Sequence, residues 1–245
     1  MKMKKLIFIL ICFVSILEGS FWWGQIKYPG NWDPVPTVYV DVINVLTLTT
    51  SVRCIPEKVV IDVNSPDFAV NLAKMPFVIL VGDDELKFSS EQIEVLRNYV
   101  INGGSIFIED VSELRYSKFD VAVRDLLKRM FPEYKLKKTD KNNVLLKSFY
   151  LLTKVVGRVN MYDYLEYVEY ENRPVIIYSR NNIISCWARD KFGKFLFECF
   201  PEGEKQRFEA QKLFLNIIMY SLCGTYKSDQ VHQKFIEEKL RFKKW

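Results

Sequence analysis

Two pairs of acidic residues follow two apolar runs of the chain. Asp83 and Asp84 come directly after the run at residues 77–82, and Glu109 and Asp110 close residues 105–110. Carboxylates that meet at one point can bind a hard cation through their oxygens, or serve together as a general acid and a general base. These four residues are therefore the first candidates for a ligand site.

The same acids also have a structural interpretation. A carboxylate after a strand can cap the turn or helix that follows, because it accepts hydrogen bonds from free backbone N–H groups. It can equally pair with a basic side chain, and three arginines are close enough in sequence to do so: Arg97, Arg115 and Arg124. We favour this structural role over ligand binding, and ligand binding over catalysis.

The histidine content argues against several classes of enzyme. His232 is the single histidine, and it lies in the basic C-terminal segment, where it is badly placed to activate a nucleophile. Ser-His-Asp and Cys-His mechanisms need such a histidine. The chain also lacks H-E-x-x-H and C-x-x-C motifs, and no G-x-G-x-x-G or Walker loop follows a strand. The sequence therefore identifies no cofactor and leaves open whether the acids hold a metal.

Aromatic residues gather near the start of the predicted mature chain, at Trp22, Trp23, Tyr28 and Trp32. Aromatic rings at a site can stack on sugars or on a protein partner, and packing in the core or at its rim is the alternative. We include Tyr28 and Trp32 among the candidate ligand-binding residues.

A β-α-β unit is predicted to position the acids. Residues 77–81 are a continuous apolar run, as expected of a parallel strand covered on both faces. Ser89 and Gln92 form a capping box that begins a helix, and Gly103 ends this helix before a second buried strand at residues 106–108. Ligands of such sheets bind beyond the carboxyl ends of the strands, where the acids stand.

The remaining elements complete one α/β domain. Further strands are predicted at residues 21–28 and 59–63, and helices at residues 36–50, 118–131 and 204–222. Four short strands separated by turn signals predict an antiparallel β-meander, at residues 164–170, 175–178, 183–187 and 194–200.

The N-terminus predicts export. Lys2, Lys4 and Lys5 precede an apolar run at residues 6–17, which is too short to span a bilayer that needs roughly 20 residues. This is the pattern of a secretory signal peptide, assigned to residues 1–20. We therefore expect a periplasmic or extracellular protein, and the alternative is a chain anchored by an uncleaved signal.

Charge is concentrated at the C-terminus. The net charge of the chain is +5, and residues 226–245 hold six basic and three acidic residues, which leaves the domain at residues 21–225 close to neutral. A neutral domain argues against nucleic-acid binding. The tail is predicted to be a basic helix with Val231, Phe235 and Leu240 on one side. It offers weak contact with a membrane surface, although we favour a solvated helix that packs on the domain.

Four cysteines remain after removal of the signal: Cys54, Cys186, Cys199 and Cys223. An exported chain can form disulfides, and the pairing of four cysteines is not decided by sequence. We favour buried free thiols, because cysteine packs as a small hydrophobic residue.

Short motifs along the chain resemble a bacterial family known as domain of unknown function 4159. The opening matches its Y-x-G-x-W pattern through Tyr28, Gly30 and Trp32. Other matches extend almost to the end of the domain, and they are Asn31, Pro34, residues 77–82, Phe88-Ser89, Leu96-Arg97, Gly103-Gly104, Glu109-Asp110, Phe119-Asp120, Arg124, Phe131-Pro132, residues 148–150, Tyr178-Ser179, Cys186-Trp187, Asn216 and Tyr220.

The resemblance implies a flavodoxin-like fold of the class I glutamine amidotransferase superfamily. True amidotransferases carry a nucleophilic cysteine after a comparable Gly-Gly strand, whereas this chain has Val111 near that place. It also has Gly82-Asp83 where family members often have Gly-His. We therefore expect a flavodoxin-like parallel sheet flanked by helices with a C-terminal antiparallel β-meander, acting as a non-catalytic module that binds a protein or a small molecule. The alternative is a carboxylate- or metal-dependent hydrolase acting on glycans.

Overall fold

The computed structural model describes the backbone of residues 21–241 and the side chains of residues 21–223. The predicted signal or anchor at residues 1–20 lies outside the described residues, and so do the side chains of the predicted basic tail. Among the described residues, no helix combines the length and the apolar character needed to cross a bilayer.

Seven strands form one sheet in the order β2-β1-β3-β4-β7-β6-β5. The first five in this order are parallel, which is the strand order of a flavodoxin-like fold. The last pairs, β7 with β6 and β6 with β5, are antiparallel. The strands are β1 (Phe21–Lys27), β2 (Cys54–Asp62), β3 (Phe77–Gly82), β4 (Ser105–Asp110), β5 (Lys137–Lys138), β6 (Glu166–Tyr170) and β7 (Arg173–Ser179).

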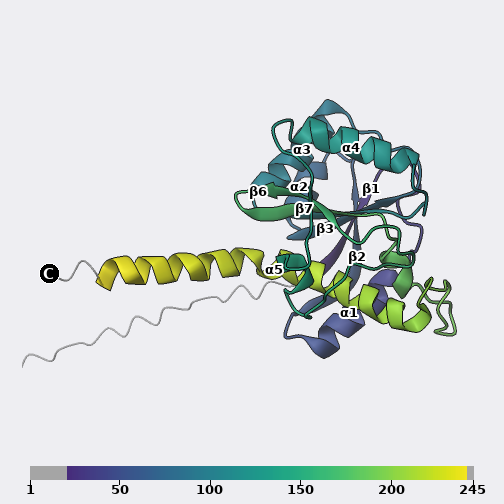
Figure 1. Ribbon diagram of the computed structural model, residues 1–245. Coiled ribbons are helices and arrows are strands. Elements are labelled where there is room, and N and C mark those ends of the chain that lie inside the picture. The colour runs from purple at the N-terminus through teal and green to yellow at the C-terminus, as the bar shows by residue number, and fades with distance from the viewer. Residues whose placement is uncertain (1–20, 242–245) are drawn as a thin grey trace, which may run out of the picture.

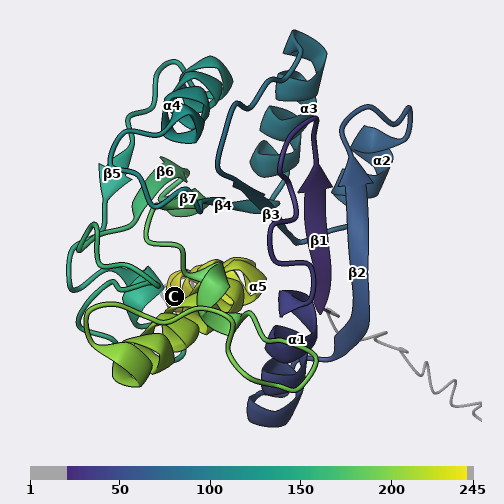
Figure 2. The ribbon, with the colours of Figure 1, turned by 90° about the vertical axis from the view of Figure 1, so that its right-hand side faces the viewer.

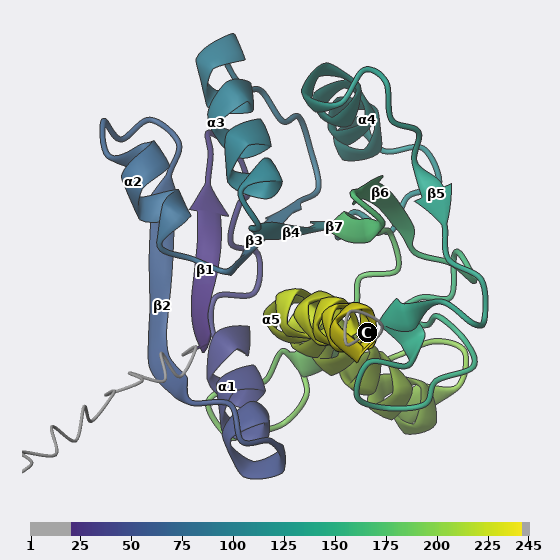
Figure 3. The same ribbon diagram turned by 90° about the vertical axis from the view of Figure 1, so that its left-hand side faces the viewer.

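Helices cover both faces of the sheet, with α2, α3 and α4 on one side and α1 and α5 on the other (Figure 3). β3 has apolar side chains on both faces, so both faces must be shielded from water. Val78 and Leu80 pack under α3 and α4, while Ile79 packs towards α1 and α5. The helices are α1 (Val38–Thr49), α2 (Phe68–Ala73), α3 (Ser90–Ile101), α4 (Lys118–Met130) and α5 (Gly203–Arg241), with short 3₁₀ turns η1 (Val144–Leu146) and η2 (Ile184–Trp187).

The predicted β-α-β unit is confirmed. β3 and β4 are parallel neighbours and are buried along their whole length. Ser89 and Gln92 form the capping box of α3, with both reciprocal hydrogen bonds present. Gly103 follows the end of α3 with φ of +104°, a backbone conformation that favours glycine. The sequence did not predict α2 or the two-residue strand β5, which are both too short to show a periodic pattern.

The predicted meander is only half correct. β6 and β7 form the expected antiparallel pair, and β7 joins the parallel sheet directly beside β4. Figure 2 shows β5 and β6 at one end of the sheet and β1 and β2 at the other. Residues 183–187 are not a strand, because the Glu109 carboxylate accepts hydrogen bonds from the Ile183 and Ile184 N–H groups and holds them in the turn η2. Residues 194–200 make only isolated bridges, between Phe195 and Arg189 and between Phe200 and Val159.

The helix predicted at residues 204–222 continues without a break to Arg241. Its first part covers the sheet, whereas its C-terminal part extends away from the α/β body (Figure 1). This differs from the expectation that a separate terminal helix packs on the domain. An uninterrupted helix keeps the direction of its first part, so it cannot turn back onto the body.

Candidate functional site

The sheet has a topological switch point between β1 and β3. β1 leads to α1 on one face, while β3 leads to α3 on the opposite face, so the two connections leave the sheet in opposite directions (Figure 3). In sheets of this kind the crevice at the switch point is the usual ligand site. The residues that follow these two strands are Tyr28, Asn31, Trp32, Asp83 and Asp84, and we call them the switch-point site.

Tyr28 joins the two strands at this point. Its side chain is buried, and its hydroxyl donates a hydrogen bond to the Val81 carbonyl at 3.0 Å. The last residue of β3 is Gly82, where a Cβ atom would lie 2.1 Å from the Tyr28 hydroxyl and 2.3 Å from the Phe119 ring. Glycine at position 82 is therefore what allows the tyrosine to approach the end of β3.

The two loops also contact each other through polar side chains. Asn31 donates to the Asp83 carboxylate at 2.7 Å, which ties the loop after β1 to the loop after β3. The neighbouring Trp32 is half-buried, and its carbonyl accepts from the buried Gln25 side chain at 2.8 Å. Asp84 points to solvent with 64% of its side chain exposed, and it pairs with Lys118 at 3.3 Å.

Acidic charge surrounds the Tyr28 hydroxyl. Burial is the main cause that raises the pKa of Tyr28, and the negative charges of Asp83, Asp84 and Asp110 raise it further. The hydroxyl therefore stays protonated and acts as a hydrogen-bond donor. The structure thus brings three of the four candidate acids around one tyrosine.

Glu109 does not belong to this group. Successive residues of a strand point to opposite faces, and Glu109 is directed towards η2, away from the side that Asp110 faces. It is fully buried and accepts hydrogen bonds from the Ile183 N–H, the Ile184 N–H and the Ser179 hydroxyl at 2.5, 2.7 and 2.9 Å. Burial raises the pKa of Glu109 to about 8, although these three donors oppose the rise.

Asp110 is buried and connects the end of β4 to α4. It accepts from the Ser112 N–H at 2.9 Å and from the Ser117 hydroxyl. Ser117 is the N-cap of α4 and accepts in turn from the Asp120 N–H at 2.8 Å. Asp110 thus fixes the start of the helix that flanks the switch-point site.

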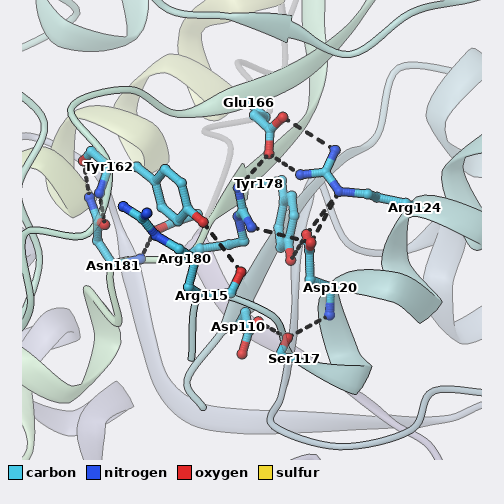
Figure 4. A network of polar contacts seen from close by, with 11 residues as sticks. Asp110, Arg115, Ser117, Asp120, Arg124, Tyr162, Glu166, Tyr178, Arg180 and Asn181 are labelled. Carbon is cyan, nitrogen blue, oxygen red and sulfur yellow. Dashed lines mark hydrogen bonds and ion pairs between the residues drawn. The ribbon is translucent and has the colours of Figure 1, made fainter. Parts of the chain in front are cut away.

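A second group of charged side chains lies further along the same edge, beyond β4 (Figure 4). Glu166 accepts two hydrogen bonds from Arg124 at 2.8 and 3.3 Å. Asp120 accepts from Arg124 and Arg180 at 3.2 Å each, and the Tyr178 hydroxyl donates to it at 3.0 Å. We call these five residues, Asp120, Arg124, Glu166, Tyr178 and Arg180, the arginine network. Two negative and two positive charges make it neutral.

Sequence reasoning placed the acids correctly at the ends of β3 and β4 but did not identify the arginine network. Arg124 was one of three arginines considered as partners of the four candidate acids, and the described structure pairs it with Asp120 and Glu166. Two signals were available: Asp120 and Arg124 stand four residues apart on a helix, and Arg180 directly follows a buried strand.

The switch-point site can accept hydrogen bonds through its carboxylates and its amide. Its indole, Trp32, is half-buried against the core, with the Lys58 ammonium 5.9 Å from the ring centre. Among residues 21–223, no group of three or more His, Cys, Asp or Glu side chains is arranged as a metal site. The deeper carboxylates of Glu109 and Asp110 already accept hydrogen bonds from the protein.

Comparison with known families matches this chain to the domain of unknown function DUF4159 over residues 23–222. The match covers β1 to α5, so the chain belongs to this family. No curated protein matches the chain.

Proposed function

We propose that this family member is an exported, non-catalytic binding module, whose ligand docks at the switch-point site. The observation that carries the proposal is the contact between Asn31 and Asp83 at 2.7 Å, which joins the two loops of the switch point into one surface. The residues of both loops are thereby held close enough for one ligand to contact them together. Proteins of this fold class bind ligands in the same place.

The chemistry of the surface indicates the kind of ligand. Asp83 and Asp84 carry negative charge and can accept hydrogen bonds, and the half-buried Trp32 follows Asn31, the partner of Asp83. A small molecule or protein segment that presents hydrogen-bond donors or positive charge, next to a flat or apolar group, complements such a surface.

Absence of catalysis is the second part of the proposal. Glu109 and Asp110 accept hydrogen bonds from backbone groups and serines, so they contribute to the local fold. A general acid and base must instead reach the substrate. The alternative from the sequence, a glycan hydrolase that uses these carboxylates, predicts product formation and is tested in the same experiment.

A thermal-shift screen of the full chain against divalent cations, sugars and nucleotides tests the binding site. We expect a ligand that raises the melting temperature of the parent protein and has no effect on an Asp83→Asn/Asp84→Asn variant. Glu91→Gln/Glu94→Gln is the matched control, because it removes the same charge from two exposed acids of α3. An equal shift in all three proteins would place the ligand elsewhere. Conversion of a bound sugar to products would instead support the hydrolase.

Export rests on Lys2, Lys4 and Lys5 before the apolar run at residues 6–17. Cell fractionation of a C-terminally tagged full chain tests it, with mass spectrometry of the N-terminus. We expect the protein outside the cytoplasm. A soluble cytoplasmic protein that retains residues 1–20 would contradict export.

A further inference from the structure

Two buried cysteines lie beside each other in the described part of the chain. Cys186 is in η2, Cys199 lies shortly before α5, and their sulfur atoms are 3.5 Å apart. Both thiols are free in this structure, and the two residues are 0% and 4% exposed. A disulfide bond is about 2.05 Å long, so the sulfur atoms need to approach by about 1.5 Å to form one.

The backbone near both cysteines is held by one residue of α5. Arg207 is buried, and its guanidinium donates to the Cys186 carbonyl at 3.2 Å and to the Phe197 carbonyl at 2.6 Å. The Cys199 carbonyl accepts from the Gly203 N–H at 3.1 Å, at the start of the same helix. Folding therefore brings the two thiols together, and no large rearrangement is needed to join them.

The two thiols differ in acidity. The pKa of Cys199 is lowered, chiefly because the Cys186 thiol donates a hydrogen bond to it, and the positive charges of Arg207 and Arg158 act in the same direction. The same hydrogen bond and burial raise the pKa of Cys186. Cys199 is thus the thiol that ionises first, and the thiolate is the attacking form of cysteine.

We propose that Cys186 and Cys199 form a disulfide by exchange with a disulfide-bearing oxidant. The Cys199 thiolate attacks one sulfur of the oxidant, forms a mixed disulfide and releases the first thiol. Cys186 then loses its proton to solvent and attacks the Cys199 sulfur, which releases the second thiol. Two protein thiols are oxidised to one disulfide, and the oxidant is reduced to two thiols. Because both residues are buried, the oxidant reaches them when the surrounding segment opens. Cys199 attacks first in openings that preserve its contact with Cys186, since that contact lowers its pKa.

The bond would close a loop formed by residues 187–198. This loop exposes three large apolar side chains, at Phe192, Leu196 and Phe197. In the reduced protein, hydrogen bonds from Arg207 hold the loop to the body. In the oxidised protein a covalent bond joins its two ends, so the apolar surface keeps its position when those hydrogen bonds open.

Refolding of the full chain from denaturant in the presence of oxidised glutathione tests the proposal. Free thiols are then alkylated under denaturing conditions, and the unreduced protein is digested and analysed by mass spectrometry. We expect Cys186 and Cys199 in one linked pair of peptides, with Cys54 and Cys223 alkylated. The melting temperature of the oxidised protein should exceed that of the reduced protein by about 5 °C.

Two variants with the same number of removed thiols serve as a matched pair. Cys186→Ala/Cys199→Ala should lose the difference in melting between oxidised and reduced protein, and Cys54→Ala/Cys223→Ala should keep it. Alkylation of both Cys186 and Cys199 in the treated wild-type chain would overturn the proposal, and so would a linked pair that involves Cys54 or Cys223. The peptide analysis uses the wild-type chain, so it does not depend on the folding of a variant.

Discussion

The switch-point site and the arginine network both lie at the carboxyl ends of the parallel strands, yet their charged side chains differ in burial and in pairing. In the arginine network, Asp120, Glu166 and Arg180 have side chains that are 9–14% exposed, and each contacts an opposite charge. In the switch-point site, Asp84 is 64% exposed and pairs only loosely with Lys118, which is itself 70% exposed.

The difference follows from the cost of removing charge from water. A buried ion must be paired and hydrogen-bonded, because its desolvation costs several kcal/mol, whereas an exposed ion is already solvated and gains about 0–1 kcal/mol from a partner. The network is therefore complete within the protein. The switch-point site can still accept a partner from outside, and this is the basis of the binding proposal.

Among single substitutions compared at one pH, the largest effect is expected from breaking the arginine network. Arg180→Met keeps an unbranched apolar stem but leaves Asp120 and Glu166 without one of their two positive partners. We expect a loss of about 3 kcal/mol in the free energy of unfolding, measured by denaturant titration. Arg129→Met is the control, since it removes an exposed pair with Asp125 and should cost less than about 0.5 kcal/mol. Equal losses in the two variants would mean that the network is not tightly coupled.

Glu109 should give the protein a distinct dependence on pH. Its pKa is about 8 in the folded protein because of burial, above the value of about 4.3 for an unperturbed glutamate. Between these values the folded state holds a proton that the unfolded state has lost. Stability from this group is therefore complete below pH 4 and falls as the pH rises to 8, by up to about 1.4 kcal/mol per pH unit.

Comparison with Glu109→Gln isolates this effect, since glutamine cannot titrate. We expect the wild-type protein to lose stability relative to the variant between pH 5 and 8, and the two curves to run parallel above pH 9. Urea titrations across this range measure it. A wild-type advantage that stays constant from pH 5 to 9 would show that the three hydrogen bonds keep Glu109 ionised when folded.

Gly82 tests the close approach on which the switch-point site depends. In Gly82→Ala the new methyl group meets the Tyr28 hydroxyl at 2.1 Å and Phe119 at 2.3 Å, so one of them must move. We expect a loss of about 2 kcal/mol in the free energy of unfolding. Gly103→Ala meets no atom within 4 Å and carries only the strain of a positive φ, about 1 kcal/mol. A smaller loss at position 82 than at 103 would contradict the approach of Tyr28 to the end of β3.

The smallest effect is expected at the exposed acids. Asp83→Asn/Asp84→Asn should change the free energy of unfolding by less than about 0.5 kcal/mol, because Asp84 is exposed and an asparagine at position 83 keeps an oxygen that can accept from Asn31. Asp110→Asn, in contrast, replaces a carboxylate oxygen that accepts from Ser112 or Ser117, and should cost about 1 kcal/mol. If Asp83→Asn/Asp84→Asn lowered the free energy of unfolding more than Asp110→Asn does, Asp83 and Asp84 would stabilise the fold rather than be available to a ligand.

Local pattern explains what could be predicted from the sequence. The run at residues 77–82, the Ser89 capping box and Gly103 act over a few residues, and each specified its element correctly. The parallel order of β3 and β4 then placed Asp83, Asp84 and Asp110 at one edge.

Contacts between distant segments explain what was missed. Glu109 binds the N–H groups of Ile183 and Ile184 in η2, which are separated from it by 74 and 75 positions in the sequence. Arg180 and Asp120, which form an ion pair, are 60 positions apart. No local pattern encodes such a partner, so residues 183–187 were predicted as a strand on their apolar character alone. The arginine network was missed for the same reason, because its members come from α4, β6 and the end of β7.

The direction of β1 also determines how the domain would be oriented by an attachment at its N-terminus. The chain enters the sheet at Phe21, and β1 ends six residues later at Lys27, directly before Tyr28. At about 3.3 Å per residue, the point of entry and the switch-point site lie roughly 20 Å apart on opposite edges of the sheet. If residues 1–20 held the protein at a membrane, its binding edge would face the surroundings rather than the lipid. A tag or carrier fused before Phe21 would likewise leave that edge unobstructed.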